Sequence, residues 1–143
     1  MTGRTTYADV AVGSRLGEQS YPITRHTLIQ YAGASGDFNT IHWSERTARA
    51  AGLPDVIGHG MLTMAETGRM LTDWAGGDPA ALVEYGVRFT SPVVVPDTDA
   101  GTQVVVSAVV AEKLPDNRVA VELTATVNGT SVLAAARAVV QLV

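Results

Sequence analysis

The sequence predicts a single α+β domain in which one long helix packs against an antiparallel sheet. Apolar residues recur at helical spacing from about Gly60 to Trp74, and Gly76-Gly77 ends the run. Between Val119 and Val127, apolar and polar residues alternate with the period of a half-buried strand. Strand-like segments predominate after the long helix, which is the order expected of an α+β domain.

The composition narrows the class of protein. At 143 residues the chain fits one domain, expected to span residues 1–143, with a core large enough to need no covalent cross-links. The absence of cysteine excludes disulfides, thiolate metal sites and a cysteine nucleophile, and it suits a cytoplasmic protein. A net charge of −4 argues against a nucleic-acid-binding face. No apolar run approaches the ~18 residues of a membrane-spanning helix, and Met1 to Ala11 hold no stretch of signal-peptide length.

Two short helices are expected before the long one. Thr24 is a suitable N-cap for a helix that runs to about Ala32. Residues 33–43 are rich in glycine, serine, aspartate and asparagine, which predicts a loop. Ser44 is placed to cap a second helix, and Gly52 fits its C-terminal end.

Three or four strands are expected, all of them after the long helix. Two run over about residues 83–90 and 103–113, and a third covers 119–127. Asn128-Gly129 predicts a tight hairpin into a last strand over about 131–142. The methionines of the long helix are expected to be mainly core, with the lining of a tunnel for a flexible ligand as the alternative: Met61, Met64 and Met70.

The predicted loop holds a candidate acid/base pair. Asp37, Asn39 and His42 lie within six positions on a segment that is not helical. A carboxylate beside an imidazole is a natural pair for proton transfer, and loops on a rigid scaffold often hold such groups. Spacing alone leaves the alternative open that these residues are only caps or surface hydrogen-bonding groups.

A second candidate feature stands where the long helix begins. His59-Gly60 places unpaired backbone N–H groups and the positive end of the helix dipole at one point. Gly60 would let a carbonyl oxygen approach its N–H closely, as in an oxyanion hole. The alternative, that Gly58 and Gly60 only permit a tight turn, is equally open on the sequence.

These segments resemble the MaoC-like, R-specific enoyl-thioester hydratases of the hot-dog fold. The family motif runs tyrosine, a few small residues, Ser/Thr-Gly-Asp-x-Asn-Pro-aliphatic-His, and a His-Gly-Met entry to the central helix follows downstream. The likeness is greatest to the catalytic B subunit of the mycobacterial (3R)-hydroxyacyl-ACP dehydratase and its actinobacterial relatives. The matching positions are Tyr31, Ser35, Gly36, Asp37, Asn39, Ile41 and His42, then His59, Gly60 and Met61, and the segments 21–25 and 84–93.

The resemblance implies a hot-dog domain and a division of roles. Asp37 and His42 would activate a water together, and the N–H of Gly60 would bind the thioester carbonyl. Supporting roles fall to Ser35, to His59 and to Asn39, for which an Asx turn is the structural alternative. The implied reaction needs no metal and no redox cofactor. One position departs from the motif, because Thr40 stands where the family has proline, so a modest loss of preorganisation is expected.

The resemblance also sets the functional alternatives. The leading hypothesis is a (3R)-hydroxyacyl-thioester dehydratase or enoyl-thioester hydratase acting on acyl-CoA or an acyl carrier protein. A non-catalytic acyl-binding subunit and an acyl thioesterase are the alternatives. Either a homodimer or a heterodimer with another hot-dog chain is expected, since a lone sheet leaves its edges open. Candidates for contact with the phosphates of coenzyme A or with an acidic carrier are Arg46, Arg49 and Arg69.

Overall fold

A computed structural model describes residues 4–143, so Met1 to Gly3 of the predicted domain and N-terminal segment lie outside the described residues. The strands carry most of the chain's second half. Their bounds are Arg15–Ile23 (β1), Leu82–Phe89 (β2), Thr102–Leu114 (β3), Arg118–Val127 (β4), Thr130–Ser131 (β5) and Leu133–Gln141 (β6). The α-helices are Arg25–Ser35 (α1), Glu45–Ala50 (α2) and Gly60–Trp74 (α3), with 3-10 turns at Tyr7–Asp9 (η1), Thr40–His42 (η2) and Pro79–Ala81 (η3).

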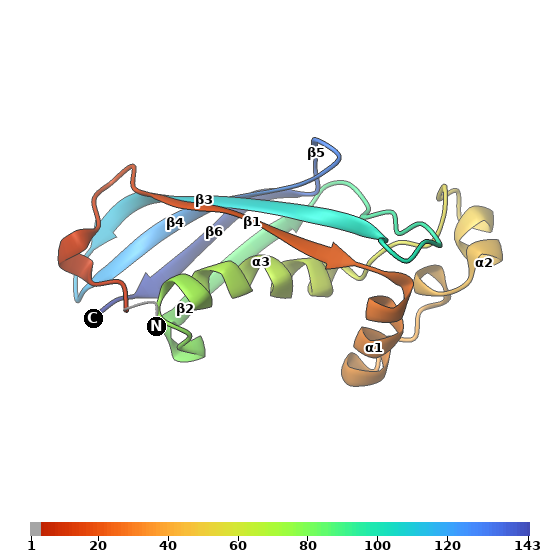
Figure 1. Cartoon of the computed structure of the whole chain (residues 1–143), viewed down its shortest axis with the longest axis horizontal. Coiled ribbons are helices and arrows are strands. Elements are labelled where there is room, and N and C mark those ends of the chain that lie inside the picture. Colours follow the sequence, from red (N-terminus) through yellow and green to blue (C-terminus); the bar gives the residue numbers. More distant parts are fainter. Residues whose placement is uncertain (1–3) are drawn as a thin grey trace.

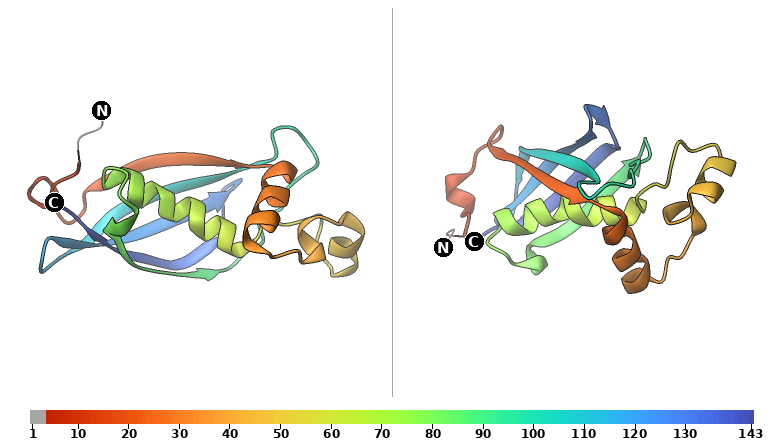
Figure 2. Two further views of the ribbon diagram at one scale, coloured as in Figure 1. Left: turned by 90° about the horizontal axis from the view of Figure 1, so that it is seen from below. Right: turned by 45° about the vertical axis from the view of Figure 1, so that its right-hand side comes forward.

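One antiparallel sheet lies over the long helix α3. Its strand order is β1-β3-β4-β6-β2, with the short β5 paired to β4. Figure 1 shows α3 beneath the sheet and running along it, and the view from below in Figure 2 shows α3 crossing the sheet face. A single long helix held by a curved antiparallel sheet is the arrangement that the hot-dog resemblance implies.

The core fills the space between α3 and the concave sheet face. Inward-facing strand residues such as Val104, Val106 and Val121 are completely buried, as period-two alternation requires. Met70 of α3 is also fully buried, so the core prediction is right for it, whereas it is wrong for Met61, which is exposed. A mixture of buried and exposed residues along α3 is typical of a helix that buries only one face.

The predicted helices are confirmed, with one shifted boundary. Thr24 caps α1 through a capping box with Thr27, and Ser44 caps α2. The long helix has the predicted bounds. The first helix ends at Ser35 and not near Ala32, because Gly36 adopts a left-handed conformation (φ +76°) that closes it. The loop therefore begins later than predicted, and its last residues form the turn η2.

A strand before the helices is missing from the prediction. Arg15–Ile23 forms the edge strand β1, paired with β3, so the sheet does not lie wholly after α3. The prediction was wrong because most of β1 is exposed, which removes the apolar alternation. Gly17 (φ +91°) and a register shift between Arg15 and Glu18 mark a bulge that interrupts the pattern further.

The remaining strands lie where the sequence places them, and β5 and β6 divide the last predicted strand. Asn128 (φ 50°) and Gly129 (φ 78°) form the predicted tight turn between β4 and β5. Among residues 4–143, no helix combines the length and the apolar character needed to cross a membrane. Both α1 and α2 lie beyond the N-terminal end of α3, and the C-terminus of the chain lies near its other end (Figure 1). The site loop therefore meets α3 at the helix's N-terminus.

Candidate active site

Local hydrogen bonds shape the loop that carries Asp37. The hydroxyl of Ser35 accepts from the N–H of Asp37 at 3.1 Å, and Asp37 Oδ1 accepts from the N–H of Asn39 at 3.1 Å. Asn39 Oδ1 then accepts from the N–H of Ile41 at 3.3 Å and caps η2. The Asx-turn interpretation of Asn39 is thereby confirmed, and Ser35 makes the same kind of contact at the start of the loop.

His42 is a buried imidazole with a fixed orientation. It is 7% exposed, and its Nδ1 lies 2.7 Å from the carbonyl oxygen of Ile57. Because a carbonyl only accepts, Nδ1 carries the hydrogen and Nε2 of the neutral ring is left as an acceptor. The segment that presents Ile57 is itself held, since the N–H of Ile57 donates to Ile41 at 3.2 Å and that of Gly58 donates to Val93 at 2.8 Å.

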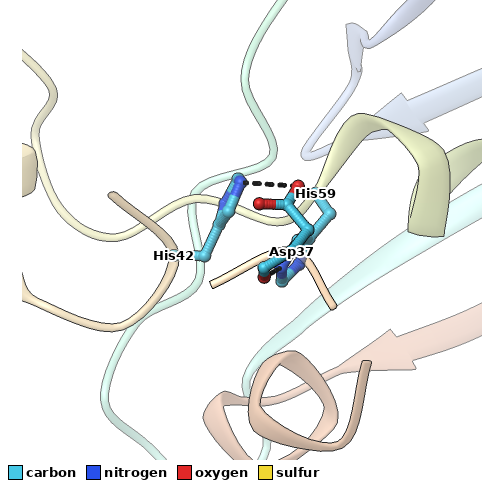
Figure 3. Close-up of side chains that lie close together, drawn as sticks. All are labelled: Asp37, His42 and His59. Atoms are coloured by element: carbon cyan, nitrogen blue, oxygen red, sulfur yellow. Dashed lines mark hydrogen bonds and ion pairs between the residues drawn. The ribbon is translucent and has the colours of Figure 1, made fainter. Parts of the chain in front are cut away.

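Asp37 faces the free nitrogen of His42. Its Oδ2 lies 4.0 Å from His42 Nε2, and about half of its side chain is exposed (Figure 3). That separation exceeds a direct hydrogen bond but suits one water held by both groups. The structure thus brings together the two predicted catalytic residues, one open to solvent and one buried.

His59 lies behind this pair and touches both members. Its Nε2 is 3.1 Å from the backbone oxygen of Asp37, and its ring stacks on His42 at 3.8 Å between centroids with 24° between planes. Tyr31 tilts against the other side, with its centroid at 4.7 Å. Burial lowers the pKa of His59, and the neighbouring His42 lowers it further, against opposing contributions from Asp37. His59 is therefore held as a neutral ring.

The three groups do not form a metal site. Asp37, His42 and His59 each offer an atom within 4.8 Å of the others, which is close enough for a shared ion by distance alone. An ion must lie in the plane of each imidazole that binds it. The two rings are stacked nearly parallel, so their planes meet only well beyond metal–ligand distances. The donor set therefore does not fit a metal ion in this arrangement.

Gly60 begins α3 beside a cavity that reaches His42. The first N–H groups of α3 have no partner within the helix and face this end of the fold. A Cβ on residue 60 would lie 3.1 Å from the ring of Phe89, so the glycine also allows that ring to pack closely. The cavity measures about 270 Å³. Its lining is His42, Ile57, Gly58, Gly60, Thr63, Phe89, Thr90, Ser91, Pro92, Val93 and Val132.

A larger hollow lies elsewhere and lacks this chemistry. It measures about 490 Å³ over β1, β3 and β4, and its charged residues are Arg15, Glu18 and Glu122. It holds no histidine and no helix N-terminus, so its size does not make it the better candidate. The smaller cavity at His42 is therefore the better candidate for a binding site.

The three arginines proposed from the sequence differ in their ion pairs. Arg49 pairs with Glu45 and Arg69 with Glu66, and neither arginine lines the cavity at His42. Arg46 is exposed on α2 and has no ion pair within residues 4–143. Ile57 could not be predicted from the sequence, because its contact with His42 is made by its backbone carbonyl and leaves no signal in residue type.

Comparisons with known proteins identify related sequences and structures. Residues 9–129 match the family model described as MaoC like domain. The 3-hydroxyacyl-thioester dehydratase X of Mycobacterium tuberculosis is 41% identical over 76 residues, which are 53% of this chain and 26% of that protein. A solved MaoC-like dehydratase superposes with a TM-score of 0.92 at 35% identity, over 99% of this chain and 43% of that one.

A third relative is closer in length. The R-hydratase of Pseudomonas aeruginosa in its unliganded form superposes with a TM-score of 0.80 at 28% identity, over 97% of this chain and 86% of that chain. The chain spans about a quarter of the dehydratase X sequence and less than half of the solved MaoC-like dehydratase. These likenesses confirm the predicted hot-dog fold, whereas the finer resemblance to a B subunit stays a prediction.

Proposed function

Because the chain belongs to the MaoC-like domain family, we propose that it is a hydro-lyase acting on acyl thioesters. It adds water across the C2–C3 double bond of a trans-2-enoyl thioester, or removes water from the (3R)-3-hydroxyacyl thioester in the reverse direction. The observation that supports this most is the pair of Asp37 and His42, whose acceptor atoms lie 4.0 Å apart, with His42 in the lining of a largely apolar cavity. The relatives named as a dehydratase and an R-hydratase support the same class of reaction.

The pair is arranged to hold and activate one water. An ionised Asp37 and a neutral His42 with a free Nε2 both accept hydrogen bonds, so a water between them donates to both. In hydration the water oxygen forms a bond to C3 while one of its protons passes to the pair. The pair then returns a proton to C2, so the double bond is saturated and the pair is unchanged. Since the two groups are coupled, the proton is assigned to the pair and not to one residue.

The N-terminus of α3 stabilises charge on the substrate. As C3 is attacked, negative charge moves onto the thioester oxygen. The N–H of Gly60 and the positive end of the α3 dipole are suited to bind that oxygen. The apolar side of the cavity, with Phe89, Val93 and Val132, is suited to an acyl chain. Thioester carbonyl and double bond then lie between Gly60 and the Asp37–His42 pair.

Ser35 and Asn39 act on the catalytic pair through the loop backbone. Each fixes a turn on one side of Asp37, and Asn39 also starts η2, which carries His42. His59 supports both residues from behind. The contacts of these three residues are with the loop backbone and with the ring of His42, so their proposed roles are positional.

The thioester carrier is proposed as coenzyme A or an acyl carrier protein. Both present a phosphopantetheine arm, and their charged parts meet the protein outside the acyl cavity. Arg46 follows η2 closely along the chain and has no ion pair within the described residues, so it is the strongest of the predicted cationic contacts. Arg49 and Arg69 are weaker candidates because each already pairs with a glutamate.

A second hot-dog domain is the proposed partner. The strand β2 is an edge of the sheet, bonded on one side to β6 only. Val83 and Phe89 of β2 are exposed, and so is Met61 on the adjoining end of α3. An unpaired edge beside exposed apolar side chains is normally covered in natural proteins. The solved relative that this chain fits with TM-score 0.92 is more than twice as long, which suits a second domain of similar size.

The direct test is hydration of trans-2-enoyl-CoA substrates by the purified chain. Crotonyl-CoA and a longer enoyl-CoA are followed by loss of enoyl-thioester absorbance, with free thiol measured in parallel. The proposal expects loss of absorbance without thiol release and a product of (3R) configuration. Release of thiol would instead identify a thioesterase, and a (3S) product would contradict the proposed geometry.

A further inference from the structure

His59 differs from the other buried polar side chains in its hydrogen bonding and in the residues that it contacts. It is 1% exposed, and its Nδ1 is the one buried side-chain nitrogen or oxygen without a hydrogen-bond partner in residues 4–143. Buried polar atoms are nearly always paired, so a histidine kept here at that cost calls for a reason. Packing alone would be served equally well by an apolar ring.

The contacts of His59 supply that reason. Its Nε2 donates to the backbone oxygen of Asp37, which fixes the tautomer, because the carbonyl accepts only. Its ring face supports the imidazole of His42 at stacking distance. One side chain therefore ties the backbone of the first catalytic residue to the ring of the second.

The loop around Asp37 needs such a tie. The other hydrogen bonds of Asp37 run to Ser35 at the end of α1 and to Asn39, the carbonyl of Phe38 accepts from Trp43 Nε1, and residues 33 to 40 are all exposed. These bonds set the local turns but do not anchor the loop to α3. The bond from His59 to Asp37 joins the loop to the residue that immediately precedes the helix.

We propose that His59 is a positioning residue that sets the distance between Asp37 and His42, and that it does so as a neutral ring with its hydrogen on Nε2. This inference rests on the proposed function and assigns His59 a role in kcat. The groups that face it are Asp37, His42 and Tyr31. A proton on Nδ1 would add a buried donor without a partner and a positive charge against the ring of His42, and either change would disturb the pair.

Two substitutions separate the contributions of His59. His59→Phe keeps a ring to stack on His42 and loses the bond to Asp37, whereas His59→Gln keeps a donor of similar reach and loses the ring. We expect kcat for His59→Phe to fall about 10- to 100-fold with KM within about 2-fold, because small displacements of reacting groups cost this much. His59→Gln should retain more activity than His59→Phe. His26→Gln, a change of an exposed histidine outside the site, is the matched control and should leave kcat unchanged.

A spectroscopic measurement keeps the test independent of turnover. Imidazole ¹⁵N spectra of the intact chain at pH 8 should show His59 with its hydrogen on Nε2, and backbone amides of residues 37–42 should shift in His59→Phe. Wild-type kcat in a folded His59→Phe, a hydrogen on Nδ1, or unmoved amides in the loop would each overturn the positioning role. If the wild-type chain hydrates no enoyl thioester, the proposed function fails, and the loop amides still decide whether His59 positions Asp37.

Discussion

Asp37 and His42 face each other across a gap of 4.0 Å between Oδ2 and Nε2, with the far nitrogen of His42 bound to the backbone of Ile57. Asp37, on the loop, is the solvent-exposed acceptor, and His42, in the turn η2, is the buried one. Within residues 4–143, neither of these two facing atoms accepts a hydrogen bond from another group. A separation of 4.0 Å suits one water held by both groups, beside the cavity that His42 lines.

The first prediction concerns Gly60. In Gly60→Ala the new Cβ would stand 3.1 Å from the ring of Phe89, so the ring or the start of α3 must shift by a few tenths of an ångström. We expect kcat for enoyl-CoA hydration to fall about 10-fold, because the N–H that binds the thioester oxygen moves with the helix start. Gly33→Ala is the matched control: it meets nothing within 4 Å and lies in the helix α1. An unchanged kcat in Gly60→Ala would remove this glycine from the mechanism.

Thr40→Pro is predicted to stabilise the protein. Thr40 is the first residue of η2, a position where proline is favoured, and the N–H of Thr40 donates no hydrogen bond within the described residues. Reduced freedom of the unfolded chain should raise the free energy of unfolding by about 0.4–1 kcal/mol. Chemical denaturation of both proteins measures the difference, and a loss of stability would show that the backbone at Thr40 does not suit proline.

Arg25 is predicted to stabilise the segments that carry the site, although it does not line the cavity. It donates to Val95 at 2.7 Å and pairs with Asp55 at 3.0 Å and with Glu45 at 3.2 Å, so it joins α1 to α2 and to the segment before Ile57. Arg25 and Asp55 are each about one-fifth exposed. We expect Arg25→Ala to lower the free energy of unfolding by about 2 kcal/mol, since hydrogen bonds to charged groups are lost and a carboxylate is left unpaired.

Two further substitutions test whether the effect is specific to Arg25. Arg25→Lys keeps the charge but not the fork that reaches several acceptors, so its loss should be intermediate. Arg46→Ala removes an exposed charge without an ion pair in the described part of the chain and should change stability by less than about 0.5 kcal/mol. Equal effects of Arg25→Ala and Arg46→Ala in denaturation experiments would contradict the role given to Arg25.

The free energy of unfolding is predicted to depend on pH through the protonation of His59. Burial holds its pKa below the ordinary value of 6.5, so below that pH the unfolded chain binds a proton that the folded chain does not. The stability contributed by the neutral ring is therefore present above pH 6.5 and is lost as the pH falls below it, by at most about 1.4 kcal/mol per pH unit. His59→Gln should show a shallower decline than the wild type in denaturation curves between pH 7 and 5. Parallel declines in the two proteins would contradict this prediction.

The sequence predicted those elements that local pattern determines. The long helix follows from apolar spacing and a glycine pair, and its bounds are those of α3. The strand Arg15–Ile23 was not predicted because it is an exposed edge with a bulge at Gly17, where neither alternation nor burial marks a strand. Edge strands take their partners from distant segments, in this case β3, and a local pattern does not contain that information.

The site divides in the same way. Asp37, His42 and Gly60 stand out because the sequence matches a motif around them. The contact of His42 with the Ile57 carbonyl and the stack of His59 on His42 join residues 15 and 17 positions apart. A backbone acceptor has no characteristic residue type, and a buried histidine beside a helix start has an ordinary structural interpretation. Only the folded chain shows that both contacts converge on the proposed catalytic pair.

The most direct test of the central claim is the rate of crotonyl-CoA hydration by Asp37→Asn. Asparagine keeps the size of the side chain but replaces one acceptor oxygen and the negative charge, so the water loses an activating group. We predict a fall in kcat of about 10²- to 10⁴-fold with an unchanged fold by circular dichroism. Asp97→Asn, at an exposed loop position far along the chain, is the control and should match the wild type. Turnover by Asp37→Asn at the wild-type rate would contradict the proposal that Asp37 and His42 activate the water.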